Sequence, residues 1–97
     1  MKKTFKLTHP KIKPARLIET VRRDVKKYLK REKRKSLPDG VEYWDFDCKF
    51  GPTEAKAEII LASEISKCIS EAEAENLESF YLEILAKPGY KKILKKL

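Results

Sequence analysis

The stretch from Val41 to Phe50 alternates strictly between two kinds of side chain, and this pattern constrains the fold most. One parity carries Glu42, Trp44, Phe46, Cys48 and Phe50, and the other carries Tyr43, Asp45, Asp47 and Lys49. Alternation with a period of two is typical of a β-strand with one buried face. The chain must therefore build a sheet and cover the mostly apolar face of this strand.

A helical pattern precedes this strand. Ala15, Ile18, Val21, Val25 and Leu29 recur at helical spacing. Pro14 suits the first turn of a helix, where its missing N–H has no intrahelical partner to lose. We expect a helix from Pro14 to about Lys33, followed by a turn at Pro38-Asp39-Gly40.

Four shorter elements complete the chain. We expect strands at residues 4–8, 56–61 and 80–85, and a helix from Ser63, as N-cap, to about Asn76. In the third strand the inward side chains are expected to be Ala57, Ile59 and Leu61, and the fourth strand ends at Pro88-Gly89. The inward stripe of the second helix comprises Ile65, Cys68, Ile69 and Ala72.

The resulting order of elements is strand, helix, strand, strand, helix, strand. It predicts an α+β fold, a ferredoxin-like β-α-β-β-α-β sandwich with a four-stranded antiparallel sheet and two helices on one face. The usual strand order of that fold is 4-1-3-2, which places the second and fourth strands at the edges. We expect residues 1–89 to form a single domain and residues 90–97 to form a basic C-terminal tail.

Hydropathy and cysteine usage bear on location. No apolar run approaches the ~18–20 residues that a membrane-spanning helix needs, and no apolar stretch follows the first lysines, so we expect neither a membrane partner nor a secretory signal. Cys48 and Cys68 are isolated in the sequence. We therefore expect a cytoplasmic protein with both thiols reduced.

Charge is distributed unevenly along the chain. The net charge is +8, yet residues 22–35 carry nine basic and two acidic side chains, whereas residues 36–86 carry three basic and twelve acidic ones. Such a basic stretch is typical of nucleic-acid binding, in which cations replace the counterions of phosphates. The candidate nucleic-acid-binding residues are Arg22, Arg23, Lys26, Lys27, Lys30, Arg31, Arg34, Lys35, Lys91 and Lys92.

Two other interpretations of this charge stay open. The basic helix can be a solvated face that a neighbouring acidic helix partly neutralises, through Glu64, Glu71, Glu73, Glu75 and Glu78. Alternatively, the chain is a protein-interaction or small-ligand module, monomeric or homodimeric, that uses the open sheet face with Tyr43, Asp45, Asp47 and Tyr81.

We expect the open sheet face to be unsuited to RNA bases. Its side chains should be Lys6, Thr8, Tyr43, Asp45, Asp47, Lys56, Glu58, Tyr81 and Glu83. With strand order 4-1-3-2, both tyrosines lie on edge strands, among carboxylates that repel phosphate, whereas RNA-recognition sheets stack bases on central aromatics. Any nucleic acid should therefore meet the helix side.

No catalytic, metal or cofactor motif stands out. Asp45, Asp47 and Glu58 are carboxylates of the kind that bind Mg²⁺ or Ca²⁺, but such charges more often discourage edge pairing. His9 is the only histidine and lies in a proline-braced loop without an identifiable nucleophile or partner acid. The sequence leaves enzymatic activity undecided, favours a non-enzymatic domain, and implies no cofactor, no metal and no catalytic residue.

Three segments carry a resemblance to a known family. They are Lys3–Phe5 running into Leu7–Leu17, then Tyr43–Gly51, then Phe80–Gly89. Together they resemble a family of short bacterial proteins known only as a domain of unknown function. The resemblance implies a bacterial, cytoplasmic setting and assigns no activity, ligand or site. From the charge pattern we expect a small domain that binds RNA, a ribonucleoprotein or another polyanion through its first helix and tail.

Overall fold

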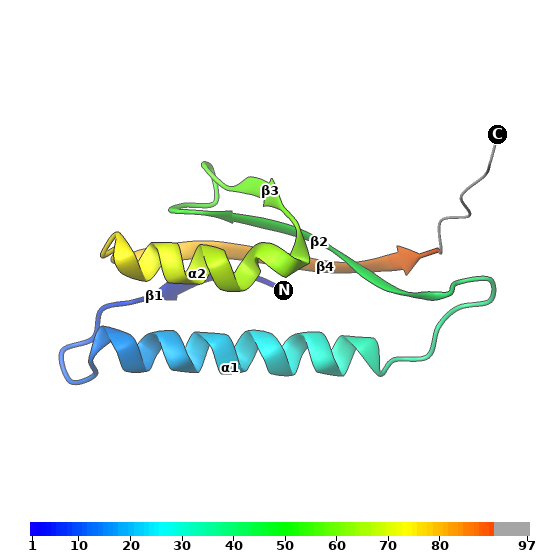
Figure 1. Ribbon diagram of the computed structural model, residues 1–97, viewed down its shortest axis with the longest axis horizontal. Coiled ribbons are helices and arrows are strands. Elements are labelled where there is room, and N and C mark those ends of the chain that lie inside the picture. Colours follow the sequence, from blue (N-terminus) through cyan, green and yellow to red (C-terminus); the bar gives the residue numbers. More distant parts are fainter. Residues whose placement is uncertain (91–97) are drawn as a thin grey trace.

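The computed structural model describes residues 1–90 and shows six main elements and one short 3₁₀ turn (Figure 1). These elements are β1 (Lys2–Lys6), α1 (Pro14–Lys33), β2 (Tyr43–Gly51), β3 (Glu58–Ile60), η1 (Ala62–Glu64), α2 (Ile65–Ala74) and β4 (Ser79–Gly89). The predicted order of strands and helices is confirmed. The predicted basic tail, apart from Tyr90, lies outside the described residues.

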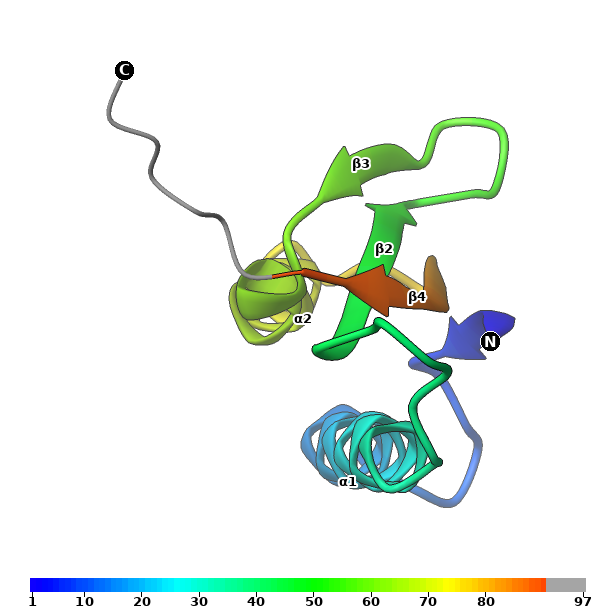
Figure 2. The same cartoon turned by 90° about the vertical axis from the view of Figure 1, so that its right-hand side faces the viewer.

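The four strands form one antiparallel sheet, and both helices pack against the same face of it (Figure 2). The α+β fold with a ferredoxin-like arrangement of elements is therefore confirmed. The strand order, however, is β1-β4-β2-β3, so the expected order 4-1-3-2 is wrong. β2 and β4 pair along nine positions, from Tyr43 with Gly89 to Gly51 with Tyr81. The two longest strands gain most by pairing with each other, which leaves the short strands at the edges.

The core lies between the sheet and the two helices. Each helix contributes three buried apolar residues, Ile18, Val21 and Val25 from α1 and Ile65, Ile69 and Ala72 from α2. The buried sheet residues that meet them are Phe5, Phe46, Cys48, Phe80, Leu82 and Ile84. The predicted inward stripe of α1 is therefore confirmed except for Ala15, which is exposed, and the predicted face of β2 is confirmed except for Glu42, which is exposed and precedes the strand. Cys68 of α2 is only half-buried.

The phase of the third strand was predicted wrongly. The pairing of Cys48 with Ile60 puts Ile60 on the helix side of the sheet, while Ile59 is 82% exposed and Leu61 is 67% exposed. Residues 59–61 form a continuous apolar run, so alternation alone does not choose between the two faces. The neighbouring strand makes that choice through its register.

Several boundaries also differ from expectation. β1 is Lys2–Lys6, not residues 4–8, and β4 is Ser79–Gly89, longer than the expected residues 80–85, so that Pro88 lies within the strand and does not stop it. Pro88 lies beyond the end of β1, where β4 has only β2 as a neighbour. Its missing N–H therefore removes no hydrogen bond to a strand on the β1 side of β4. The second helix begins after a 3₁₀ turn in which Glu64, not Ser63, accepts a backbone hydrogen bond, from the N–H of Leu61 at 2.8 Å.

The helices in residues 1–90 are too short or too polar to cross a lipid bilayer.

Candidate nucleic-acid interface

The outer face of α1 and the residue that caps its C-terminus, Arg34, carry a row of four cations. Arg23, Lys27, Lys30 and Arg34 follow one another at steps of four, three and four residues, opposite the buried stripe of Ile18, Val21 and Val25, and all four are exposed. At 1.5 Å per residue this row spans about 16 Å along the helix. We call these four residues the basic ridge.

Carboxylates do not pair with the basic ridge in the described part of the chain. Residues 1–90 contain two ion pairs, Lys35 with Glu32 at 2.8 Å and Lys87 with Asp47 at 2.6 Å. Neither joins α1 to α2, although α2 and its flanks carry exposed glutamates. Direct ion pairing with the acidic helix therefore does not neutralise α1.

The polar link between the two helices is an arginine bound to serines. One terminal nitrogen of Arg22, Nη1, donates to the Oγ of Ser66 at 2.6 Å, and the other, Nη2, donates to the Oγ of Ser70 at 2.6 Å. Ser66 and Ser70 stand one turn apart on α2, which lets both hydroxyls meet the planar guanidinium. Because hydroxyls are neutral, this contact leaves the positive charge of Arg22 uncompensated.

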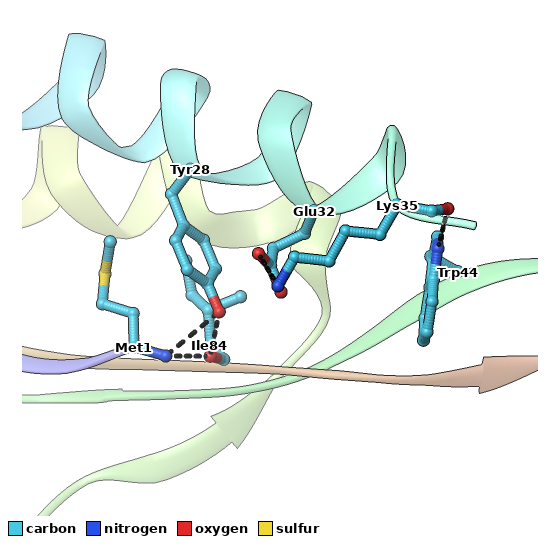
Figure 3. A network of polar contacts seen from close by, with 6 residues as sticks. All are labelled: Met1, Tyr28, Glu32, Lys35, Trp44 and Ile84. Atoms are coloured by element: carbon cyan, nitrogen blue, oxygen red, sulfur yellow. Dashed lines mark hydrogen bonds and ion pairs between the residues drawn. The ribbon is translucent and has the colours of Figure 1, made fainter. Parts of the chain in front are cut away.

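The sheet-facing side of α1 is held by a second set of polar contacts (Figure 3). The amino group of Met1 donates to the carbonyl oxygen of Ile84 at 2.7 Å and to the hydroxyl of Tyr28 at 3.2 Å. Burial, followed by the charge of Glu32, raises the pKa of the Tyr28 hydroxyl. The indole N–H of Trp44 donates to the carbonyl of Lys35 at 2.9 Å, just beyond the helix.

These contacts sort the candidate cations by position. Arg23, Lys27, Lys30 and Arg34 form the ridge, and Lys26 is exposed on the flank toward α2. Arg22 contacts α2, Lys35 pairs with Glu32, and the guanidinium of Arg31 lies 5.7 Å from the ring centre of Tyr28. Lys91 and Lys92 lie outside the described residues. The helix thus presents fewer fully outward cations than the sequence predicted.

The open sheet face differs from expectation because of the strand order. Tyr43 and Tyr81 lie on the two central strands, not on edges. Tyr81 is nevertheless only 4% exposed, and its hydroxyl donates to Glu83 at 2.8 Å; burial and this hydrogen bond raise its pKa to about 12. The ring of Tyr43 lies against Gly89, where a side chain would collide with it. Tyr81 therefore serves packing within the sheet, whereas Tyr43 is 42% exposed on a central strand.

The three carboxylates considered for metal binding do not gather. Asp45 and Asp47 lie on the open face, but Glu58 pairs with Phe50 on the helix face. Asp47 is bound to Lys87, and this hydrogen bond raises the pKa of the Lys87 ammonium. Lys56 and Thr8 lie outside the strands, so they too leave the expected face. Within residues 1–90, no group of three or more His, Cys, Asp or Glu side chains is placed to hold a metal ion.

The remaining reactive side chains have local structural partners. The Nδ1 of His9 accepts a hydrogen bond from the backbone N–H of Lys11 at 2.9 Å in the exposed loop before α1. Burial raises the pKa of the Cys48 thiol to about 11 and raises that of Cys68 as well. Raised thiol pKa values leave little thiolate near neutral pH, which disfavours a nucleophilic role.

Comparison with known protein families identifies the family of the chain. The family described as "Family of unknown function (DUF6172)" matches residues 1–95. The chain belongs to this family. No curated protein and no solved structure matches the chain.

Proposed function

We propose that this domain binds RNA or a ribonucleoprotein surface through the basic ridge of α1, in the cytoplasm of a bacterial cell. The observation that supports this most is the exposed row Arg23, Lys27, Lys30 and Arg34, which has no carboxylate partner within residues 1–90. Unpaired cations at regular spacing suit a chain of phosphates, because each contact releases a counterion.

The local charge around the ridge supports the same partner. Beside the ridge residues Lys30 and Arg34, the last turn of α1 contributes Arg31 and Lys33, and Lys35 follows the helix and pairs with Glu32. Exposed cations that repel one another contribute little to folding, whereas a polyanion relieves their repulsion on binding. The end of α1 therefore concentrates positive charge where a strand of phosphates can extend along the ridge.

A salt titration of RNA binding tests the proposal. The full chain should bind a single-stranded RNA at ~50 mM salt, with an affinity that falls steeply as salt rises. Reversing the charge of Arg23, Lys27 and Lys30 to Glu should weaken binding by more than about a hundredfold and flatten the salt dependence by roughly two units on a log–log plot.

The matched control reverses three exposed lysines on the other side of the molecule. Lys2, Lys6 and Lys49 lie on the open sheet face, so their replacement by Glu changes the net charge equally. Binding should survive better in this control than in the ridge variant. No RNA binding by the wild-type chain at ~50 mM salt, or equal losses in the two variants, contradicts the proposal.

A second candidate function uses the open sheet face as a protein interface. Ile59 and Leu85 are 82% and 40% exposed, and they line one shallow hollow with Asp47, Lys49 and Glu83. Exposed apolar side chains of this kind mark contact surfaces when they are adjacent. Measurement of the mass in solution distinguishes this candidate: a stable dimer that Ile59→Lys converts to monomer supports it, and a monomer at high concentration argues against a homodimer.

A further inference from the structure

A groove separates α1 from the start of α2 on the helix side of the molecule. Its volume is about 290 Å³. Leu29 of α1 and Ala62 of η1 are its partly exposed apolar residues, and they lie above the buried Val25, Ile65 and Ile69. Its polar rim is formed by Arg22, Lys26, Ser63 and Ser66. The groove therefore combines an apolar floor with hydrogen-bonding groups at its edge.

The charge of this groove has one sign. Among the residues that line it, Arg22 and Lys26 are the charged ones, and both are cations. Asp24 and Glu64 are adjacent in sequence to lining residues, but neither lines the groove, and the Oε1 of Glu64 accepts a hydrogen bond from the backbone N–H of Leu61. An occupant with negative charge therefore meets two cations and no lining carboxylate.

Arg22 is already oriented for such an occupant. Its Nη1 and Nη2 are each 2.6 Å from a serine hydroxyl of α2, and so its position is fixed without a carboxylate. A hydroxyl that accepts from an arginine keeps its own proton to donate, and a guanidinium has five N–H donors in total. Arg22, Ser66 and Ser70 thus form a positively charged cluster with unused donors beside the groove.

We propose that this groove holds one nucleotide of a single-stranded RNA, with its phosphate at Arg22 and Lys26 and its base against Leu29 and Ala62. This inference rests on the proposed function and makes it more specific. A base inside a duplex is paired and stacked, so it cannot reach an apolar floor between two helices, whereas unpaired segments offer their bases. Lys26 stands one turn before Lys30, so the strand continues directly onto the basic ridge.

The test fills the groove and compares two RNA forms. Ser63→Phe places a large side chain on the exposed rim without changing charge. We expect it to weaken binding of a single-stranded oligonucleotide about tenfold, since the phosphate and base lose charge-assisted and apolar contacts. Binding of a duplex of the same sequence should change less than about twofold.

Two further variants make the result independent of folding. Thr53→Phe makes a similar change in the exposed loop between β2 and β3 and should leave both affinities unaltered. Lys26→Gln should weaken single-strand binding more than Lys67→Gln, which removes an exposed lysine from α2. Urea unfolding of each variant identifies any that has lost its fold.

The outcomes separate the groove from the ridge. If the wild-type chain binds RNA but Ser63→Phe affects single strand and duplex equally or neither, the groove assignment is overturned and the ridge stands. If no RNA binds, the proposed function itself fails. If an acidic amphipathic peptide binds more tightly than RNA and Ser63→Phe abolishes that binding, the groove is a protein site and the nucleotide assignment is wrong.

Discussion

The two helices pack into the same core but expose side chains of opposite charge to solvent. Each contributes three buried apolar residues to the layer against the sheet. α1 is 20 residues long with a basic ridge, whereas α2 is 10 residues long, and it and its flanks carry exposed glutamates. Opposite charges on adjacent helices usually suggest interhelical ion pairs, yet within residues 1–90 the polar contact between them is an arginine bound to serines.

The fold and the charge pattern are therefore separate properties of this chain. Exposed ion pairs contribute on the order of 0–1 kcal/mol each, so their absence costs the fold little. Apolar burial holds both helices in place, and the surface of α1 is left available to an external partner. Three experiments test whether the two helices differ in this way.

The largest change in stability is expected when a buried side chain of either helix is truncated. Ile69 of α2 is 1% exposed and Val25 of α1 is 5% exposed. Ile69→Ala should lower the free energy of unfolding by about 3 kcal/mol, and Val25→Ala by about 2 kcal/mol, because they leave cavities of different size. Urea unfolding measures both. A loss below about 1 kcal/mol for Ile69→Ala would show that α2 is not anchored by this residue.

An intermediate effect is expected at the link between the helices. A double-mutant cycle with Arg22→Ala and Ser70→Ala should give a coupling energy of about 1 kcal/mol, because Arg22 donates to Ser70. The same cycle between Arg22 and Glu71, which no ion pair joins, should give a value near zero. Equal coupling in the two cycles would mean that electrostatic attraction, not the hydrogen bond, connects the helices.

The smallest effect is expected from the acidic helix. Replacing Glu71, Glu73 and Glu75 by Gln should change the free energy of unfolding by less than about 0.5 kcal/mol, since these exposed carboxylates form no ion pair with α1. RNA affinity should also change little at ~0.15 M salt, because exposed charges that are more than the Debye length of about 8 Å apart are largely screened there. A marked gain in RNA affinity would support the interpretation that α2 partly neutralises the basic ridge.

The sequence predicted the elements whose periodicity is long and unambiguous. α1 begins at Pro14 and ends at Lys33 as expected, and Trp44, Phe46 and Cys48 face the helices as the alternation indicated. Both patterns extend over about ten residues or more, so a shift of phase would expose many apolar side chains. Local signals of this kind survive in the folded chain.

What the sequence did not predict depends on contacts between distant residues. The strand order follows from nine pairs between β2 and β4, and the face of Ile59 follows from the register against β2. In the candidate interface, the cations were found from composition, but the contact of Arg22 with Ser66 and Ser70 spans more than 40 residues. Serines at i and i+4 on a helix that packs beside an arginine-bearing helix are the only local signal for it.

The hydrogen bond from Trp44 to Lys35 turns the indole into a built-in reporter. Trp44 is the one tryptophan of the chain, and its indole touches the backbone immediately after the ridge. Its intrinsic fluorescence therefore senses whether the end of α1 is seated on the sheet, without any attached dye. Quenching or a wavelength shift on adding an oligonucleotide would register occupancy at this end of the molecule in real time.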